Sequence, residues 1–337
     1  MSIKRNTNYE LLRIISMFMI VTIHANMYLS MFASGELFTV VNGIINGICN
    51  IGVTCFVLIS GYYGIKYKLS KLIKMELMMI VFSILETIFL WLLMPENMNG
   101  NALIEQVIKS FFPVVSRKYW FYSCYIVLFL LSSYIEKFID ILSQKEFSYL
   151  LGLLLLLFSV FPTFFYFEIV PDNGKGLVQM IFVYMGGVYI RKYRNGKYLN
   201  WLSSYRGLIL FAILWIVNAI SHEYPLQIGG IYHHLCKDNS ITNIVMAVIL
   251  FLQFGKLQIQ SKMINSIASQ VFAVFALNNS IVLIVYHYLR NFNILVNCHQ
   301  MGFILMLGIN CGIMLVCFLI GYLVNGILKT IYKVINV

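Results

Sequence analysis

The chain has 337 residues, of which 60% are hydrophobic and 11% are charged, and its formal net charge is +11. Soluble domains carry about 25% charged residues, so this composition excludes a soluble enzyme and indicates a protein that crosses the bilayer many times. We interpret the positive charge as loop charge that sets orientation, because no basic run is interleaved with aromatic residues as nucleic-acid binding would require.

Ten apolar runs are long enough to span a bilayer. They cover residues 9–31, 38–62, 73–94, 119–135, 147–167, 177–190, 206–221, 240–255, 267–289 and 302–328, of which the sixth and eighth are short. The segment 103–115 is also apolar, but Glu105, Lys109 and Pro113 interrupt it, so we expect a helix at the membrane surface or dipping into it. The sequence therefore predicts an all-α, polytopic integral membrane protein with about ten transmembrane helices, in one membrane-embedded domain over residues 1–337.

The Lys and Arg residues are distributed unequally between the two sides of the predicted membrane. If the N-terminus is cytoplasmic, 17 of the 24 Lys and Arg residues fall in inner segments and 6, Lys118 among them, fall in outer loops, and Arg13 lies within the first span. Cytoplasmic loops of membrane proteins carry such an excess of Lys and Arg. We therefore expect both termini in the cytoplasm.

The first span contains three ionisable side chains, Glu10, Arg13 and His24. A helix turns about 100° and rises about 1.5 Å per residue, so Arg13 and His24 lie on one face, roughly 16 Å apart along the axis. Glu10, three residues before Arg13, can pair with it on that face. Ionisable groups at membrane depth usually face a protein interior or a wet cavity, so each is a functional candidate. The alternative is that Arg13 extends to the cytoplasmic surface and His24 only hydrogen-bonds a neighbouring helix.

Other polar and aromatic residues mark the later spans. Glu86 lies in the middle of the third span, where it can act as a second acid or base or pair with another helix. Gly186-Gly187 predicts close helix packing and not a phosphate-binding loop, because no strand precedes it.

The seven Cys residues show no C-x-x-C and no zinc-binding spacing, so we expect no disulfide framework and no metal site. His233, His234 and Cys236 form a loop cluster that could bind a metal, but no carboxylate or second Cys stands at ligand spacing.

The first span resembles the opening of the membrane-bound acyltransferase 3 family, in which an acidic residue, two apolar residues and Arg are followed by ten residues and His. The stretch from Phe56 to Ser60-Gly61-Tyr62 resembles the family's Phe-x-x-x-Ser-Gly-Tyr pattern. Lys71-Leu-Ile-Lys74 stands where members usually carry Arg-x-x-Arg, and Tyr119-Trp120-Phe121 with Tyr125 resembles the aromatic start of their fourth span. The ninth span departs from the pattern, because Asn278 stands in the place of a family His and Asn cannot titrate.

This resemblance implies an integral membrane O-acyltransferase of a bacterial cell membrane. It would move an acyl group, taken to be acetyl, from cytoplasmic acyl-CoA (acetyl-CoA) to a hydroxyl of an exported or cell-surface polysaccharide. Acyl-CoA would be its co-substrate, polysaccharide and membrane lipids its partners, and neither a metal nor a nucleic acid is expected. The oligomeric state stays open.

The resemblance also assigns roles to residues. Arg13, Lys71 and Lys74 would bind the phosphates of CoA at the cytoplasmic surface. His24, assisted by Arg13 and Glu10, would be the catalytic residue, acting either as general base or as carrier of the acyl group. We expect Trp120, Tyr125 and Ser60 at the polysaccharide substrate.

Each assignment has a plainer alternative. The positive-inside rule and lipid phosphate would also account for the lysines, and the aromatic belt of the membrane interface for Trp120 and Tyr125. The alternative for Ser60 is a hydrogen bond between helices, with Gly61 allowing their close approach. For the whole protein the alternatives are a saccharide transporter, in which Arg13 and His24 form a gate or proton relay, and an inactive relative marked by Asn278.

Overall fold

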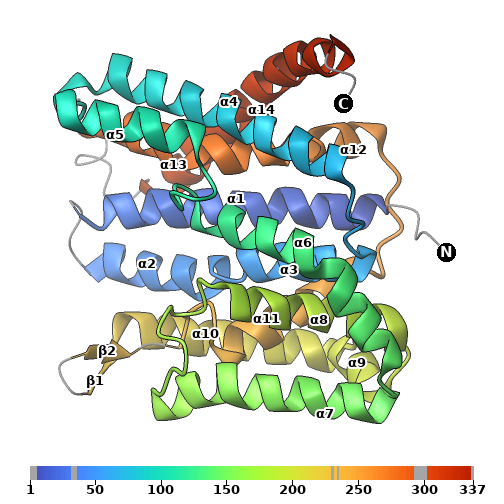
Figure 1. Ribbon diagram of the computed structural model, residues 1–337. Helices are drawn as coiled ribbons and strands as arrows, with labels where there is room; N and C mark the ends of the chain where they lie inside the picture. Colours follow the sequence, from blue (N-terminus) through green and yellow to red (C-terminus); the bar gives the residue numbers. More distant parts are fainter. Residues whose placement is uncertain (1–5, 32–35, 229–230, 234, 292–301, 335–337) are drawn as a thin grey trace. The chain divides into compact units, whose positions relative to one another are not determined.

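The computed structural model describes residues 6–31, 36–228, 231–233, 235–291 and 302–334. Apart from one short hairpin, its regular structure in these ranges is helical (Figure 1). Seven helical segments of the described residues are long and apolar enough to cross a membrane: Thr7–Leu29, Phe38–Tyr63, Leu69–Leu93, Gln144–Phe165, Tyr205–Glu223, Val271–Leu289 and Phe303–Thr330. The predicted all-α polytopic fold is thus confirmed.

The other three predicted spans are helical as well. They are α6 (Trp120–Ile141), α8 (Leu177–Tyr193) and α11 (Ile241–Phe254). With 17 and 14 residues, α8 and α11 are the two spans that the sequence predicts to be short. The apolar segment at 103–115 forms α5 (Gly100–Phe111), whose first turn is capped by the Asn99 side chain. Ten crossings and their orientation stay predictions.

Two compact units divide the chain. The first contains Met1–Ile23, Ser34–Lys66 and Val127–Ala268, and the second contains His24–Ala33, Tyr67–Ile126 and Ser269–Val337. Helices α1 (Thr7–Leu29) and α6 each contribute to both units. The expectation of a single membrane domain stays a prediction.

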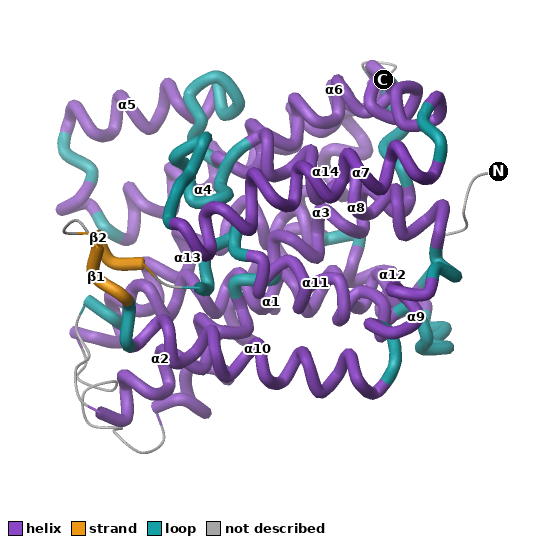
Figure 2. Tube along the Cα trace, turned by 90° about the horizontal axis from the view of Figure 1, so that it is seen from below, coloured by secondary structure: helices purple, strands orange, loops and turns teal. Residues whose placement is uncertain are grey.

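The first unit holds most of the short helices and the hairpin, which Figure 2 shows in orange. Its further elements are α2 (Glu36–Cys49), α3 (Gly52–Tyr63), α7 (Gln144–Leu155), η2 (Leu156–Phe165), α9 (Lys197–Leu202), α10 (Tyr205–Glu223), β1 (Leu226–Ile228), β2 (Ile231–His233) and α12 (Lys262–Ala268). The strands are antiparallel, with Leu226 opposite His233. A capping box between Ser143 and Glu146 begins α7, and the wider π-helical turns of η2 accommodate Pro162, which has no backbone N–H to donate.

Glycines let the helices of the first unit approach closely. A Cβ on Gly61 of α3 would lie 2.0 Å from the carbonyl oxygen of Tyr184, and one on Gly187 of α8 would lie 2.4 Å from that of Leu58. Helices α3 and α8 therefore pack backbone against backbone, as small residues permit in membranes. This contact confirms the helix-packing roles predicted for Gly61 and for Gly187 of the Gly186-Gly187 pair, while a Cβ on Gly186 would meet only the Leu58 side chain at 3.7 Å.

The second unit contains the remaining long helices. They are α4 (Leu69–Leu93), α5, α13 (Val271–Asn291) and α14 (Gly302–Val334), with the short 3₁₀ turn η1 (Pro95–Asn97) after α4. Figure 1 shows α5 lying along α4. Helix α13 packs against both α4 and α14 and so forms the centre of this unit.

Candidate active site

The ion pair predicted in the first span is present. Arg13 Nη1 donates to both carboxylate oxygens of Glu10 at 3.1 Å, and the side chains of Arg13 and Glu10 are 18% and 5% exposed. A buried carboxylate needs such a partner at membrane depth. Glu10 therefore neutralises Arg13 in part and fixes the direction of its guanidinium.

Aromatic rings surround this end of α1 within the first unit. Tyr9 stacks on Phe251 with ring centroids 4.5 Å apart, and its ring is 5.2 Å from that of Tyr62. Asn8, which is fully buried, binds the backbone of Leu257 and accepts from Ile259 N. The start of α1 is thus fixed against α3, α11 and the segment that follows α11.

His24 and Asn278 form a direct side-chain hydrogen bond in the second unit, between Nδ1 and Oδ1. The Asn278 amide is oriented, because its Nδ2 donates to the Phe275 carbonyl oxygen at 2.7 Å. An amide oxygen only accepts, so His24 Nδ1 must carry the hydrogen, and the lone pair of the neutral imidazole then lies on Nε2. The residue that replaces the family His thus selects the tautomer of His24.

A buried ion pair lies in the same unit. Lys118 Nζ is 3.1 Å from Glu86 Oε2, and both side chains are 7% exposed. Glu86 also accepts hydrogen bonds from the Tyr119 hydroxyl and from Ser280 Oγ. The Glu86 carboxylate is therefore bound by donors from two other parts of the chain, the loop before α6 and helix α13.

Lys118, like Glu86, makes several hydrogen bonds besides the ion pair. Its Nζ donates to Ser110 Oγ at 3.1 Å, to Thr87 Oγ1 at 3.2 Å and to the Ser83 carbonyl oxygen at 3.3 Å. Burial lowers the pKa of Lys118, and the Glu86 carboxylate opposes that shift. Sequence reasoning left the role of Glu86 open and placed Lys118 in an outer loop. The signal that it missed is that a carboxylate in mid-span requires a cation, and Lys118 directly precedes a predicted span.

Phe275 connects these two groups. Its ring lies 6.1 Å from Tyr119 and 5.5 Å from Phe121, while its carbonyl oxygen accepts from Asn278. Helix α13 therefore carries Asn278 toward His24 and Ser280 toward Glu86, and the start of α6 packs on Phe275. These residues form the polar centre of the second unit.

Two of the three predicted substrate-binding residues, Trp120 and Tyr125, lie in an aromatic cluster at the start of α6, and the third, Ser60, lies in α3. The Phe121 ring stacks on Tyr125 and meets Trp120 edge-on, with centroids 6.0 Å and 5.8 Å apart, and Trp120 and Tyr125 are both half-buried. Ser60 Oγ donates to the Phe56 carbonyl oxygen of its own helix at 3.1 Å, and this contact lies within α3, not between helices. Substrate contact by all three residues stays a prediction.

Lys71 lies in the first turn of α4 and Lys74 in the next turn. Lys74 Nζ lies 5.4 Å above the ring centroid of Tyr332, whose hydroxyl donates to the Lys74 carbonyl oxygen at 3.0 Å. Sequence reasoning did not foresee Tyr332, which is 258 residues away in the chain. Arg13 belongs to the first unit and these lysines to the second, so their joint binding of phosphate stays a prediction.

His287 is not part of this polar centre. Its Nε2 lies 3.6 Å from Glu96 Oε1, at the other end of α13 from Asn278. Among the described residues, no three His, Cys, Asp or Glu side chains are grouped to hold a metal ion, and the six described Cys are free. His234 and Cys298 lie outside the described residues.

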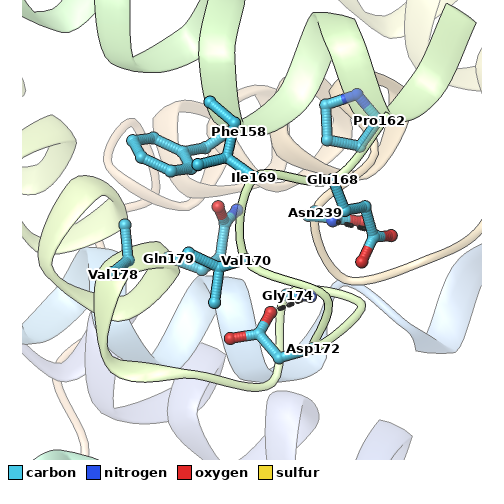
Figure 3. Close-up of a pocket in the computed structure, with 10 residues that line it drawn as sticks. All are labelled: Phe158, Pro162, Glu168, Ile169, Val170, Asp172, Gly174, Val178, Gln179 and Asn239. Atoms are coloured by element: carbon cyan, nitrogen blue, oxygen red, sulfur yellow. Dashed lines mark hydrogen bonds between the residues drawn. The ribbon is translucent and has the colours of Figure 1, made fainter. Parts of the chain in front are cut away.

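A small cavity opens in the first unit, away from every predicted site residue described there. Its volume is about 10 Å³, which is room for about one water molecule. Figure 3 shows its lining, formed by Phe158, Pro162, Glu168, Ile169, Val170, Asp172, Gly174, Val178, Gln179 and Asn239. We place no substrate in it, because neither a sugar ring nor an acyl chain fits.

Fold and site together define a polytopic membrane protein with an oriented histidine beside a buried ion pair. The family model described as an acyltransferase domain matches residues 6–322. The chain therefore belongs to the acyltransferase 3 family and is a membrane acyltransferase. Neither a search of curated proteins nor a search of solved structures finds a match to this chain.

Proposed function

We propose that the protein is an O-acyltransferase that transfers an acetyl group from cytoplasmic acetyl-CoA to a hydroxyl of an exported or cell-surface polysaccharide in a bacterial plasma membrane. Membership of the family supports acyl transfer. The acyl donor, the acetyl group and the polysaccharide acceptor are part of the proposal.

The observation that carries this proposal is the hydrogen bond between His24 and Asn278. With the hydrogen on Nδ1, the Nε2 lone pair of His24 accepts the proton of an acceptor hydroxyl as its oxygen attacks the thioester carbonyl. The carbon–sulfur bond then breaks, and the thiolate of CoA takes up a proton. The same lone pair can instead attack the thioester and carry the acyl group before a hydroxyl takes it.

The donor would be held by positive charge. We propose that Arg13, Lys71 and Lys74 each bind phosphates of CoA, since cations are the usual partners of phosphate in proteins. Glu10 would orient Arg13, with which it pairs. Trp120, Tyr125 and Ser60 would contact the acceptor. No metal takes part in this proposal.

The test uses His24→Gln and His24→Ala in cells at matched expression. Gln keeps hydrogen-bonding groups but has no basic nitrogen. We expect acetylation of the surface polysaccharide to fall by at least about 10²-fold if His24 removes a proton, and to vanish if it carries the acyl group. Near-normal acetylation with His24→Gln would contradict a chemical role and favour a saccharide transporter.

A further inference from the structure

Three asparagines lie along one side of a helical segment that is long and apolar enough to span the membrane, two of them in α2 and the third directly after it. Asn42, Asn46 and Asn50 are four residues apart, so they drift by only about 80° around the helix over roughly 12 Å. All three are half-buried. Partly exposed amides are unusual in a membrane helix, because hydrocarbon offers no partner for their polar atoms.

Two of these amides form a directional chain of hydrogen bonds that ends at a carboxylate. Asn46 Nδ2 donates to Asn42 Oδ1 at 3.0 Å, while Asn50 Nδ2 donates to the backbone carbonyl oxygen of Asn46 at 3.1 Å. Asn42 Nδ2 in turn donates to Glu223 Oε1 at 2.9 Å. We call Asn42, Asn46, Asn50 and Glu223 the asparagine lane.

Close packing of α2 on α10 places the carboxylate beside the amides. A Cβ on Gly43 would lie 2.7 Å from Glu223 Cγ, and one on Gly47 would lie 2.9 Å from the Ala219 backbone nitrogen. Side chains larger than glycine would therefore separate the two helices. Figures 1 and 2 both show α10 beside α2.

Polar groups continue behind the lane into the interior of the first unit. Asn218 of α10 is fully buried, and its Nδ2 donates to Asn243 Oδ1 of α11 at 2.8 Å and to the Gly47 carbonyl oxygen at 3.4 Å. Asn218 Oδ1 is also buried and has no hydrogen-bond partner among the described residues. A buried amide oxygen without a partner is expensive, and a hydroxyl from outside the chain would satisfy it.

The orientation predicted from Lys and Arg places the Glu223 end of the lane at the outer surface and Asn50 deeper in the bilayer. At Asn50 the span is interrupted, because α2 ends at Cys49 and α3 begins at Gly52. Interrupted membrane helices are frequent at sites that bind polar substrates in mid-membrane.

We propose that the asparagine lane is a polar strip that is open to water and binds hydroxyl groups of a saccharide entering from the outer side. An amide offers a donor and an acceptor, and so does a hydroxyl, while the Glu223 carboxylate accepts from two hydroxyls at once. The identity of this saccharide as the acyl acceptor rests on the proposed function. The proposal that the lane is open to water does not rest on the proposed function.

The first experiment measures access of water to the lane, without reference to activity. Asn46→Cys and Asn50→Cys are labelled in whole cells with a membrane-impermeant, positively charged methanethiosulfonate. Ile44→Cys and Val40→Cys are the controls, because Ile44 and Val40 are 39% and 56% exposed but lie on the opposite side of α2. We expect the lane positions to react at least about 10-fold faster, since only a thiolate reacts and it does not form in hydrocarbon. Equal rates at Asn46→Cys and Ile44→Cys would overturn the proposal.

The second experiment measures binding of saccharide. The surface polysaccharide fraction extracted from the source cells is used as acceptor for the purified protein. Asn46→Leu should raise the KM for this acceptor by about 2- to 12-fold, the loss of one hydrogen bond, while Asn46→Gln should partly restore it. The same fraction should slow labelling of Asn46→Cys. If labelling is fast but neither KM nor labelling responds to saccharide, the binding role is wrong. If wild-type protein transfers no acetyl group, the proposed function fails while labelling still decides whether the lane is wet.

Discussion

At the scale of single residues, the contact between His24 and Asn278 explains how His24 is kept in one orientation although Asn278 stands in the place of a second histidine. The amide oxygen receives the Nδ1 hydrogen, and the Phe275 carbonyl prevents the amide from turning over. Asn278 needs no charge of its own for this role.

Asn278→Leu should therefore lower acetyl transfer, because His24 loses the group that selects its tautomer. Leaving a buried donor without a partner costs about 1–3 kcal/mol, which predicts a roughly 5- to 150-fold lower kcat. Asn278→Asp keeps an oxygen at the same place and should retain more activity. Steady-state kinetics of purified variants checks this, and equal losses in Leu and Asp variants would contradict it.

The ion pair of Glu86 and Lys118 gives a second prediction at this scale. Lys118→Met leaves the Glu86 carboxylate buried without its cation, and breaking a buried pair in this way costs about 3–5 kcal/mol. The Tm in detergent should fall. The double variant Glu86→Gln/Lys118→Met should be more stable than Lys118→Met alone, since no charge is left buried. If the double variant is less stable than Lys118→Met alone, the unpaired charge of Glu86 is not the cause of the lower Tm.

At the scale of elements, the start of α4 places Lys71 where it does not help the helix. The N-terminus of a helix carries partial positive charge, so a cation in its first turn is unfavourable there. The same field attracts phosphate. The position of Lys71 therefore suits an anionic ligand better than it suits α4, and Lys74 lies one turn further on.

Lys71→Ala and Lys74→Ala should each raise the KM for acetyl-CoA. The loss of one charge-assisted contact is worth about 1.5–3 kcal/mol, or roughly 10- to 150-fold. The kcat at saturating donor should change little. If the KM for acetyl-CoA of the double variant Lys71→Ala/Lys74→Ala equals that of the wild type, neither lysine binds the donor. Lipid phosphate and the positive-inside rule would then account for both.

The contact between α3 and α8 provides a test with an internal control. Gly61→Ala brings a methyl group to 2.0 Å from the Tyr184 carbonyl oxygen, which is backbone and cannot move aside. Gly186→Ala, in contrast, meets only the Leu58 side chain at 3.7 Å. Overpacking typically costs about 1–3 kcal/mol, so Gly61→Ala should lower the Tm in detergent and Gly186→Ala should not. Similar melting of both variants would contradict the close approach of these helices.

At the scale of the whole molecule, the sequence was sufficient where the determining interactions are local. The helical spans follow from runs of apolar residues, and the pair of Glu10 and Arg13 follows from its i, i+3 spacing. Asn278 lies 254 residues from its partner His24, Ser280 lies 194 residues from Glu86, and no spacing rule relates either pair. Lys118 was interpreted as loop charge for the same reason, since its partner lies on another helix.

Orientation in the membrane is a prediction for the whole chain. With both termini in the cytoplasm, residues 63–72 and 191–205 form inner loops. Single cysteines in these loops should react with an impermeant reagent only after the cells are opened. Labelling in intact cells would reverse the orientation and with it the proposed route of the donor.

The loop before α11 gives a pH dependence of stability. Burial raises the pKa of Asp238 to about 6, with Lys175 opposing the shift and Asp172 adding to it. Because this pKa is higher in the folded state, the folded protein binds the proton more tightly, and stability is lost as pH rises from the ordinary pKa toward about 6. Asp238→Asn should therefore raise the Tm more at about pH 7.5 than at about pH 4.5. An equal gain at both values would show that the Asp238 charge does not limit stability.

The bond between His24 and Asn278 also has a consequence for how the family diversifies. Histidine and asparagine codons differ by a single first-position nucleotide, so an ancestor can pass from one to the other without an intermediate residue. Suppose that selection preserves a group that accepts the Nδ1 hydrogen of the first-span histidine. Wherever that histidine is retained, the position of Asn278 should then be occupied only by side chains with a suitable acceptor atom. Lineages that have lost that histidine should be free of the restriction, and the two positions should therefore vary together when many family sequences are aligned.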